Sequence, residues 1–273
     1  MCIRDRATTN LSDYILGGRS LGSFVTALSA GASDMSGWLL MGLPGAIYLS
    51  GVHEAWIAVG LTIGAYLNWR LVAGRLRLYT ERTDNALTLP DYLAGRFEDT
   101  SNVLRVVTTL VILVFFTVYC ASGVVAGARL FESMFGMPYS VALWVGAACT
   151  IAYVFIGGFL AVSWTDTIQA SLMITALLVA PAVAYFAVTG QLQPTQSIAE
   201  MIGAEKFDWM HNASTIGVIS LLAWGLGYFG QPHILVRFMA ADSVASIPRA
   251  RRIGMTWICL LYTSPSPRDR QKS

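Results

Sequence analysis

Length, composition and charge place this chain in a membrane: of its 273 residues, 55% are hydrophobic and only 12% are charged, against about 25% charged residues in a soluble domain. The formal net charge of +2 is too small to indicate a nucleic-acid partner, and the four cysteines show no metal-ligand spacing. Composition therefore predicts a polytopic membrane protein and excludes an ordinary soluble domain.

Both ends of the chain differ in character from the segments beside them. Residues 1–6 and 263–273 each contain the tripeptide Arg-Asp-Arg. A tripeptide shared by both ends is typical of adapter sequence that has been read through as protein. We therefore expect residues 1–10 and 263–273 to be non-native, and residues 11–262 to form one transmembrane core with six spans and the start of a seventh.

The first apolar stretch, from Leu21 to Ile47, carries one acidic residue near its centre, Asp34. At about 1.5 Å per residue this stretch is long enough to cross a bilayer. A carboxylate at mid-membrane costs roughly 2.5 to 3.5 kcal/mol, so it usually faces a cavity or an ion. Weak helix formers surround Asp34, and the backbone is expected to open there and offer its carbonyls. This pattern predicts half of a cation site.

Apolar runs bounded by polar or Gly/Pro residues predict the spans, and a seventh begins near Gly254. Arginines cluster between the second and third spans and again after the sixth, from Arg237 onward. The positive-inside rule makes that side cytoplasmic, including the segment before the first span. Residues 74–102 should then be a cytoplasmic loop with a short helix around Leu89 to Phe97, and residues 189–212 an external loop. The expected spans are 21–48, 55–73, 104–130, 139–158, 165–188 and 213–236.

The sixth span carries three glycines and a proline between Trp224 and Pro232, which a continuous helix tolerates poorly. We therefore expect it to break near its middle. The first and sixth spans are corresponding members of two five-helix repeats, and a pair of interrupted helices is typical of a transporter's binding site. Helix amino ends favour a carboxylate, whereas unwound carbonyls favour a cation. A zwitterionic amino acid together with Na⁺ would suit both.

Motifs follow one another in a fixed order at Tyr14–Ser20, Ala30–Trp38, Gly157–Phe159 with Trp164–Asp166, and Trp224–Pro232. Together they closely resemble the solute:sodium symporter family over about residues 11–260. The resemblance implies an all-α, LeuT-like inverted-repeat fold, present here as the first repeat plus the start of the second. It also implies symport rather than enzyme chemistry, with a Na⁺ gradient as energy source, L-proline as cargo and a multi-pass place in the bacterial cytoplasmic (inner) membrane. The family carries one extra helix before the core, which these residues lack.

The resemblance also implies roles for individual residues. For Na⁺ it implies the backbone carbonyls of Ala32 and Met35, with Asp34 and Ser36 close to the cation. Hard oxygen ligands of this kind suit a hard cation, and the family's remaining ligands come from a later helix, the eighth of the core. For proline it implies aromatic walls and hydroxyl groups, supplied by Ser36, Trp38, Tyr119, Trp224, Tyr228 and Pro232.

Arg19 and Asp166 match positions that the family uses in coupling or ion handling, but each has a simpler explanation. Arg19 could have no role beyond marking the cytoplasmic side of the membrane. Asp166 could cap a helix that begins after Trp164. Asp34 could likewise cap a broken helix. The aromatic candidates could serve packing or anchoring at the membrane interface: Tyr119, Trp224 and Tyr228.

Two further interpretations of the whole chain stay open. In some relatives the same fold is a membrane sensor module joined to a signalling domain. Alternatively, the chain is an inactive fragment that lacks most of the second repeat. Similar pockets could also take other small amino acids, so the sequence leaves the cargo partly open.

Overall fold

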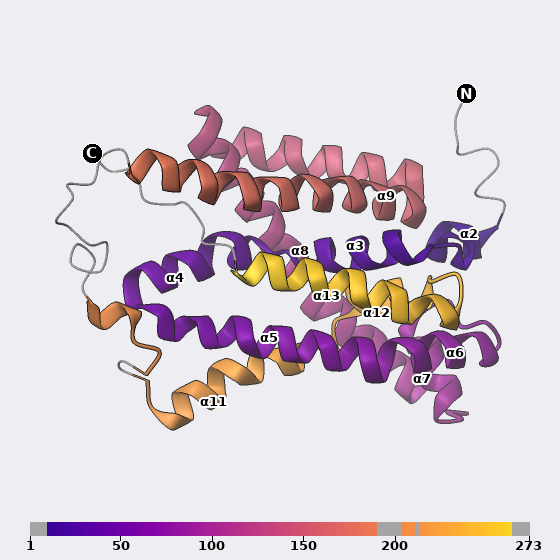
Figure 1. Ribbon diagram of the computed structural model, residues 1–273. Helices are drawn as coiled ribbons and strands as arrows, with labels where there is room; N and C mark the ends of the chain where they lie inside the picture. The colour runs from indigo at the N-terminus through magenta and orange to yellow at the C-terminus, as the bar shows by residue number, and fades with distance from the viewer. Residues whose placement is uncertain (1–9, 190–203, 211–212, 264–273) are drawn as a thin grey trace.

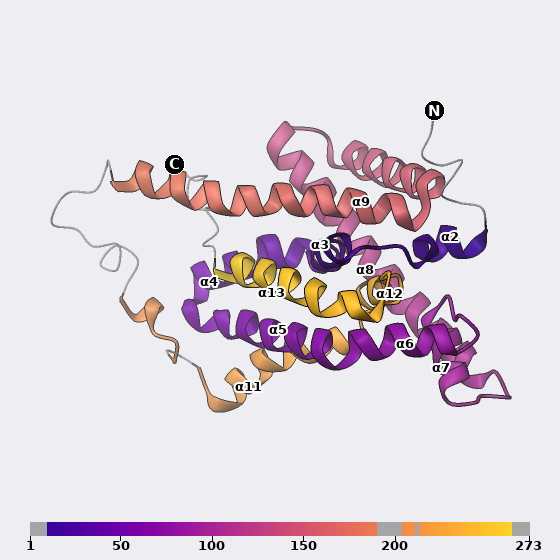
Figure 2. The same cartoon turned by 45° about the vertical axis from the view of Figure 1, so that its right-hand side comes forward.

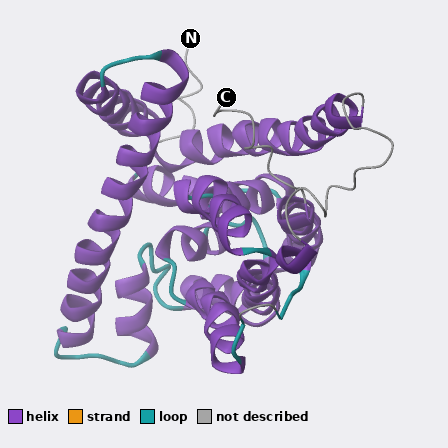
Figure 3. Ribbon diagram, turned by 90° about the vertical axis from the view of Figure 1, so that its left-hand side faces the viewer, coloured by secondary structure: helices purple, strands orange, loops and turns teal. Residues whose placement is uncertain are grey.

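The computed structural model describes residues 10–189, 204–210 and 213–263. The ends expected to be non-native fall almost wholly outside the described residues, as does most of the expected external loop. Within the described residues every regular element is helical (Figure 3), which confirms the predicted all-α class. In Figures 1 and 2, α5 (Trp56–Leu67), α9 (Tyr139–Thr189) and α13 (Ile247–Thr263) extend across both views. Helix α3 (Ser23–Asp34) is seen nearly end-on in Figure 2, so it crosses them.

Three helical stretches among the described residues are long and apolar enough, by length and composition, to cross a membrane: Val52–Arg82, Val103–Phe135 and Tyr139–Val179. The first continues past the predicted end of span two, so the loop expected from residue 74 begins only after Arg82. The short helix expected around Leu89 is present as α7. The other elements are α2 (Leu11–Leu16), η1 (Gly17–Arg19), the π-helical η2 (Trp38–Gly42), α4 (Leu43–Ser50), η3 (Val52–Ala55), the π-helical η4 (Asn68–Ala73), α6 (Gly74–Arg82), α7 (Leu89–Arg96), α8 (Val103–Phe135), η5 (Ala204–Phe207), α11 (Thr215–Ala223), η6 (Trp224–Phe229), α12 (Pro232–Met239) and η7 (Val244–Ser246).

Helix α9 turns at a single glycine instead of over a loop. At Gly158 the backbone angles are φ 59° and ψ −161°, and a Cβ there would lie 2.8 Å from the Tyr14 ring, so only glycine fits. The Tyr14 hydroxyl donates to the carbonyl oxygens of Val154 and Phe155 at 3.4 and 3.2 Å, where the first arm of α9 ends. The second arm turns back from this point (Figure 2). The prediction of a loop over residues 159–164 is therefore wrong, because the helix resumes at once.

Glycines also let α5 and the sixth span approach each other closely. Gly60 and Gly64 lie about one turn apart on α5, and a Cβ on Gly64 would lie 2.1 Å from the Gly225 carbonyl oxygen. A Cβ on Gly60 would lie 2.4 Å from the carbonyl oxygen of Leu222. Small residues at this spacing allow membrane helices to pack backbone against backbone. The contact holds the sixth span against α5, and it thereby positions the interrupted part of the sixth span in space.

Candidate functional site

The first span is broken directly after Asp34. Helix α3 ends at Asp34, and Met35 has extended backbone angles of φ −72° and ψ 97°. The chain becomes helical again through η2, where Ser36 Oγ accepts a hydrogen bond from the Leu39 amide at 3.3 Å and so caps the second half of the span. The predicted opening of the backbone around Asp34 is confirmed.

The sixth span is broken as well, between η6 and α12. After Gly230 the backbone of Gln231 is extended, with φ −80° and ψ 108°, and Pro232 is the first residue of α12. Proline suits this position because its missing N–H is one that the first helical turn cannot pair anyway. The predicted interruption is confirmed, and it lies at Gly230 and Gln231.

The two breaks lie against each other. The Tyr228 hydroxyl donates a hydrogen bond to the Asp34 carboxylate. Asn68 Nδ2 of η4 in turn donates to the Tyr228 carbonyl oxygen at 3.0 Å, and the Tyr228 side chain is buried. The phenol therefore connects the interrupted part of one span to the interrupted part of the other.

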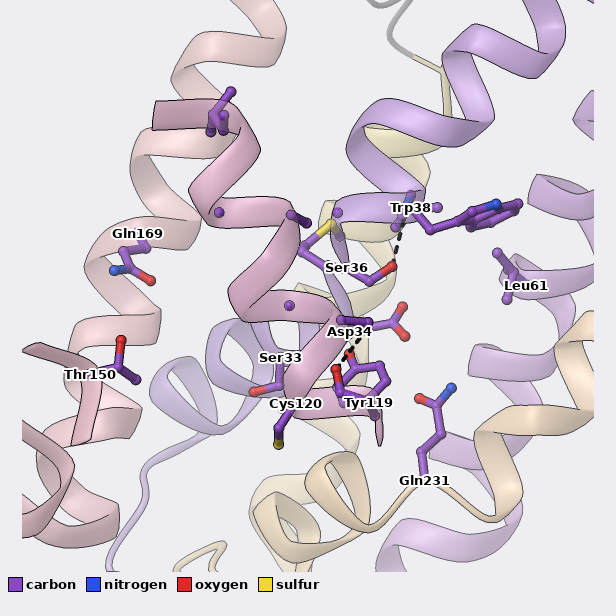
Figure 4. Close-up of a pocket in the computed structure, with 18 of the residues that line it drawn as sticks. Ser33, Asp34, Ser36, Trp38, Leu61, Tyr119, Cys120, Thr150, Gln169 and Gln231 are labelled. Carbon is purple, nitrogen blue, oxygen red and sulfur yellow. Dashed lines mark hydrogen bonds between the residues drawn. The ribbon is translucent and has the colours of Figure 1, made fainter. Parts of the chain in front are cut away.

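A cavity of about 1160 Å³ opens beside the first break (Figure 4). Residues of the first span, α5, α8, α9 and the sixth span line it. Ala32, Tyr228 and Pro232 are not among its lining residues, although Tyr228 reaches Asp34 and Pro232 follows the lining residue Gln231. The predicted site residues that do line the cavity are Asp34, Met35, Ser36, Trp38, Tyr119 and Trp224.

Two tryptophans form one wall of the cavity. Trp38 stacks on Trp224, with ring centroids 4.7 Å apart and an interplanar angle of 13°, and the two side chains are 39% and 50% exposed. Tyr119 stacks instead on His233, at 5.1 Å between ring centroids. A stacked, partly open indole pair offers a broad apolar surface to a small guest.

The oxygen atoms around Asp34 suit a monovalent cation. The Ala32 carbonyl accepts a hydrogen bond from the Met35 amide at 3.1 Å, which leaves its second lone pair for another contact. Ser36 adds a hydroxyl at the edge of the same cavity. In the part of the chain that the structure describes, no group of three or more His, Cys, Asp or Glu side chains could hold a metal ion. A cation beside Asp34 would therefore meet one carboxylate and otherwise neutral oxygens, a set that fits Na⁺.

Asp166 lies inside the second arm of α9, and the alternative that it caps a helix starting after Trp164 is wrong. Its carboxylate pairs with Arg237 Nη2 of α12 at 2.9 Å, and the two side chains are 16% and 9% exposed. The hydroxyls of Ser29 and Ser33 on α3 donate to the same carboxylate oxygen at 2.8 and 3.3 Å. This buried ion pair therefore joins α3, α9 and α12 close to the first break.

Sequence reasoning missed several residues around the two breaks. We expected Arg237 to mark the cytoplasmic end of the sixth span, but it lies within α12 and is buried. The spacing did carry a signal for Ser29 and Ser33, which lie four residues apart and therefore share one helix face in the turn before Asp34. Gln231 was also missed, although it stands in the predicted break.

Arg19 holds the arginine-rich end of the molecule together. Its backbone is left-handed, with φ 52°, and its guanidinium donates to five acceptor atoms in other parts of the chain. These are the carbonyl oxygens of Met239 at 2.7 Å, Ala86 at 2.9 Å and Thr80 at 3.5 Å, together with Thr80 Oγ1 at 3.1 Å and Asn85 Oδ1 at 2.8 Å. Arg19 therefore does more than mark one side of the membrane, because it ties the start of the first span to the end of α12.

Further contacts fasten the chain just after α12. The Leu21 amide donates to the Ala240 carbonyl oxygen at 3.2 Å, and the Asp242 amide donates to the Leu21 carbonyl oxygen at 2.9 Å. Arg77 Nε of α6 donates to the Ala241 carbonyl oxygen at 2.6 Å. The first span, α6 and the end of α12 are thus held in one hydrogen-bonded group. We call this group the clasp, and it consists of Arg19, Leu21, Arg77 and residues 239–242.

Comparison with known proteins gives a family and several relatives. The model of the sodium:solute symporter family matches residues 14–265. The sodium/proline symporter of Escherichia coli (strain K12) is 66% identical over 255 residues, which are 93% of this chain and 51% of that protein. The high-affinity proline transporter PutP of Bacillus subtilis (strain 168) is 54% identical over 255 residues, 93% of this chain and 54% of that protein. The chain spans about half the length of the curated relatives it matches.

A solved structure resembles the fold. It is described as the substrate-bound outward-open state of a Na⁺-coupled sialic acid symporter, and it matches with a TM-score of 0.73 at 19% sequence identity. The match covers 96% of this chain and 55% of that one. At this identity the likeness concerns the fold alone, and it confirms the predicted LeuT-like class.

Proposed function

The chain belongs to the sodium:solute symporter family, and from this premise we propose that it supplies the broken-helix half of a Na⁺-coupled L-proline symporter in the bacterial inner membrane. Members of this family are transporters, and we propose that moving solute, without bond chemistry, is the whole activity. Alternating access would come from rocking of helix bundles around the site between the two breaks. The observation that carries the proposal is the meeting of two interrupted spans beside one cavity, with Asp34 at its edge.

The cation half of the site centres on Asp34. A carboxylate at mid-membrane costs roughly 2.5 to 3.5 kcal/mol, so it needs a compensating partner. Its hydrogen-bond partner here is the neutral Tyr228 hydroxyl, which leaves the negative charge for a cation. We assign Na⁺ to the carboxylate of Asp34, the carbonyls of Ala32 and Met35, and the hydroxyl of Ser36.

The proline half of the site lies on the aromatic wall. A five-membered apolar ring fits against the stacked face of Trp38 and Trp224, because burying apolar surface there is favourable. The polar groups of proline would find hydroxyls and the polar backbone of the breaks around this wall. We assign proline binding to Ser36, Trp38, Tyr119, Trp224, Tyr228 and Pro232.

Coupling would come from two groups that tie the first and sixth spans together. Arg19 closes the arginine-rich end through the clasp. Asp166 holds α12 against α3 through Arg237 and Ser29. We assign these two residues to coupling because each group must rearrange if the two broken spans move apart.

The test uses a completed transporter, in which residues 11–262 of this chain replace the matching half of the Escherichia coli relative. Uptake of labelled proline is measured in proteoliposomes with an inward Na⁺ gradient and with K⁺ in its place. We expect accumulation only with Na⁺, and equal uptake in K⁺ would contradict the coupling. Competition by other small amino acids then defines the cargo. Vesicles holding residues 1–273 alone form a parallel arm, in which we expect no uptake because the family's later sodium ligands are missing.

A further inference from the structure

Gln231 stands in the break of the sixth span, where the proposed function gives it no role. It lines the same cavity as Asp34, and Figure 4 shows its amide directed into that cavity, on the side of Leu61. Its Oε1 atom is buried and has no hydrogen-bond partner among the described residues. Gln231 therefore holds a buried, unpaired acceptor at the margin of the cavity that lies beside the two breaks.

The fold does not need this amide. The backbone carbonyl of Gln231 accepts from the amides of Ile234 and Leu235 at 3.2 and 3.1 Å, so the main chain alone starts α12. A buried acceptor without a donor costs free energy, and most such groups in proteins are paired. An acceptor left unpaired beside a cavity thus indicates a donor that arrives with a guest.

The guest's chemistry follows from the charges around the cavity. Na⁺ and the ammonium group of an amino acid are both cations, and they repel each other when both bind one carboxylate. Asp34 already receives the Tyr228 hydroxyl and is assigned to Na⁺. A neutral oxygen at the other break would hold the ammonium group apart from the metal ion.

We propose that Oε1 of Gln231 accepts a hydrogen bond from the ammonium group of the amino-acid cargo, so that Gln231 selects cargo with an N–H donor. This inference rests on the proposed transport function, because it names a contact within that same site. A site built to receive a donor should discriminate strongly against a cargo that lacks one. Gln231 is then a specificity-determining residue.

The test compares proline with tetrahydrofuran-2-carboxylate, which has a ring oxygen in place of the N–H group. Both compete with labelled proline for uptake by the completed transporter. Gln231→Met keeps the length of the side chain but removes the acceptor. We expect Gln231→Met to weaken proline binding about tenfold, as for the loss of one hydrogen bond to a charged group. The difference in affinity between proline and the ether should become smaller, and the Na⁺ dependence of uptake should be retained.

Gln169 supplies the matched control, because it lines the same cavity from α9 but is exposed. Gln169→Met should leave the ratio of the two affinities unchanged. Gln231→Glu keeps an acceptor and adds negative charge, so it should hold proline at least as tightly and exclude the ether more strongly. Loss of proline binding in Gln231→Glu would show that the Gln231 amide donates to the carboxylate of proline instead, and would overturn the inference. If Gln231→Met does not reach the membrane, Gln231→Glu decides alone.

Two failures can be told apart. If the unmodified completed transporter takes up no proline, or takes it up without Na⁺, the proposed function fails. If it transports proline with Na⁺ and Gln231→Met still rejects the ether as strongly as before, only the inference about Gln231 fails.

Discussion

Helix α12 meets two opposite environments at its two ends. At its amino end the cavity leaves an acceptor of Gln231 unpaired, while at its carboxyl end the carbonyls of Met239, Ala240 and Ala241 all accept hydrogen bonds from the clasp. The helix between them is only 8 residues long. Polar groups that are paired within the chain therefore stabilise the fold at one end of α12, whereas the unpaired acceptor at the other end is available to a ligand.

The ion pair in the middle of α12 should give the largest effect when broken. Arg237→Gln leaves the carboxylate of Asp166 buried without its charged partner, and breaking a buried ion pair on one side typically costs about 3–5 kcal/mol. We expect a large fall in thermal stability of the purified protein in detergent. Removing both charges, with Asp166→Asn and Arg237→Gln together, should restore much of this loss. Equal losses in the single and double variants would show that the charge pair is not what holds α12.

Loosening the clasp should have an intermediate effect. Arg19→Gln removes the charged hydrogen bonds to five acceptor atoms, and one such bond contributes about 1.5–3 kcal/mol. We expect a cysteine placed at Ala241, which is fully buried, to react with a maleimide at least about tenfold faster in the Arg19→Gln background. The labelling uses a variant without the native cysteines. Arg70→Gln, at an exposed position of η4, serves as the control. An unchanged labelling rate in Arg19→Gln would show that Arg19 does not keep the clasp closed over Ala241.

The aromatic wall should show the smallest effect. Trp38→Ala removes one ring of the stacked pair, and such a pair contributes about 0.5–1.5 kcal/mol beyond its buried area. Proline affinity of the completed transporter should fall severalfold. Trp224→Ala should do the same, and the double variant should lose less than the sum, because one contact is removed twice. Trp56→Ala, from an edge-on pair with Trp209 outside the cavity, should leave affinity unchanged; additive losses at Trp38 and Trp224 would argue against a shared wall.

The breaks were predictable because their cause is local. Weak helix formers around Asp34 and the glycines before Pro232 act on the backbone where they stand, and both interruptions lie where the sequence places them. The contacts of the charged side chains were not predictable in the same way, because their partners are distant in the sequence. Arg237 and Asp166 are 71 residues apart, and Arg19 and Met239 are 220 residues apart. An arginine at the end of an apolar run looks the same whether it meets cytoplasm or a buried carboxylate.

The prediction at Gly158 was wrong for a different reason. The sequence offers two adjacent glycines followed by an aromatic-rich segment, and we expected the chain to need several residues to reverse. The left-handed angles at Gly158 and the Tyr14 hydroxyl, which accounts for two carbonyls of the first arm, make a loop unnecessary. Tyr14 lies 140 and 141 residues before the two carbonyl groups in the chain, so the local sequence pattern could not predict this contact.

The most direct test of the whole account is the Na⁺ dependence of proline uptake in Asp34→Asn. The substitution keeps the size of the side chain and an acceptor for the Tyr228 hydroxyl but removes the negative charge. We predict that the Na⁺ concentration needed for half-maximal uptake rises at least about tenfold, as expected when a charged ligand becomes neutral. An unchanged Na⁺ dependence would mean that Asp34 only caps the broken helix, and would contradict the assignment of this break as a sodium site.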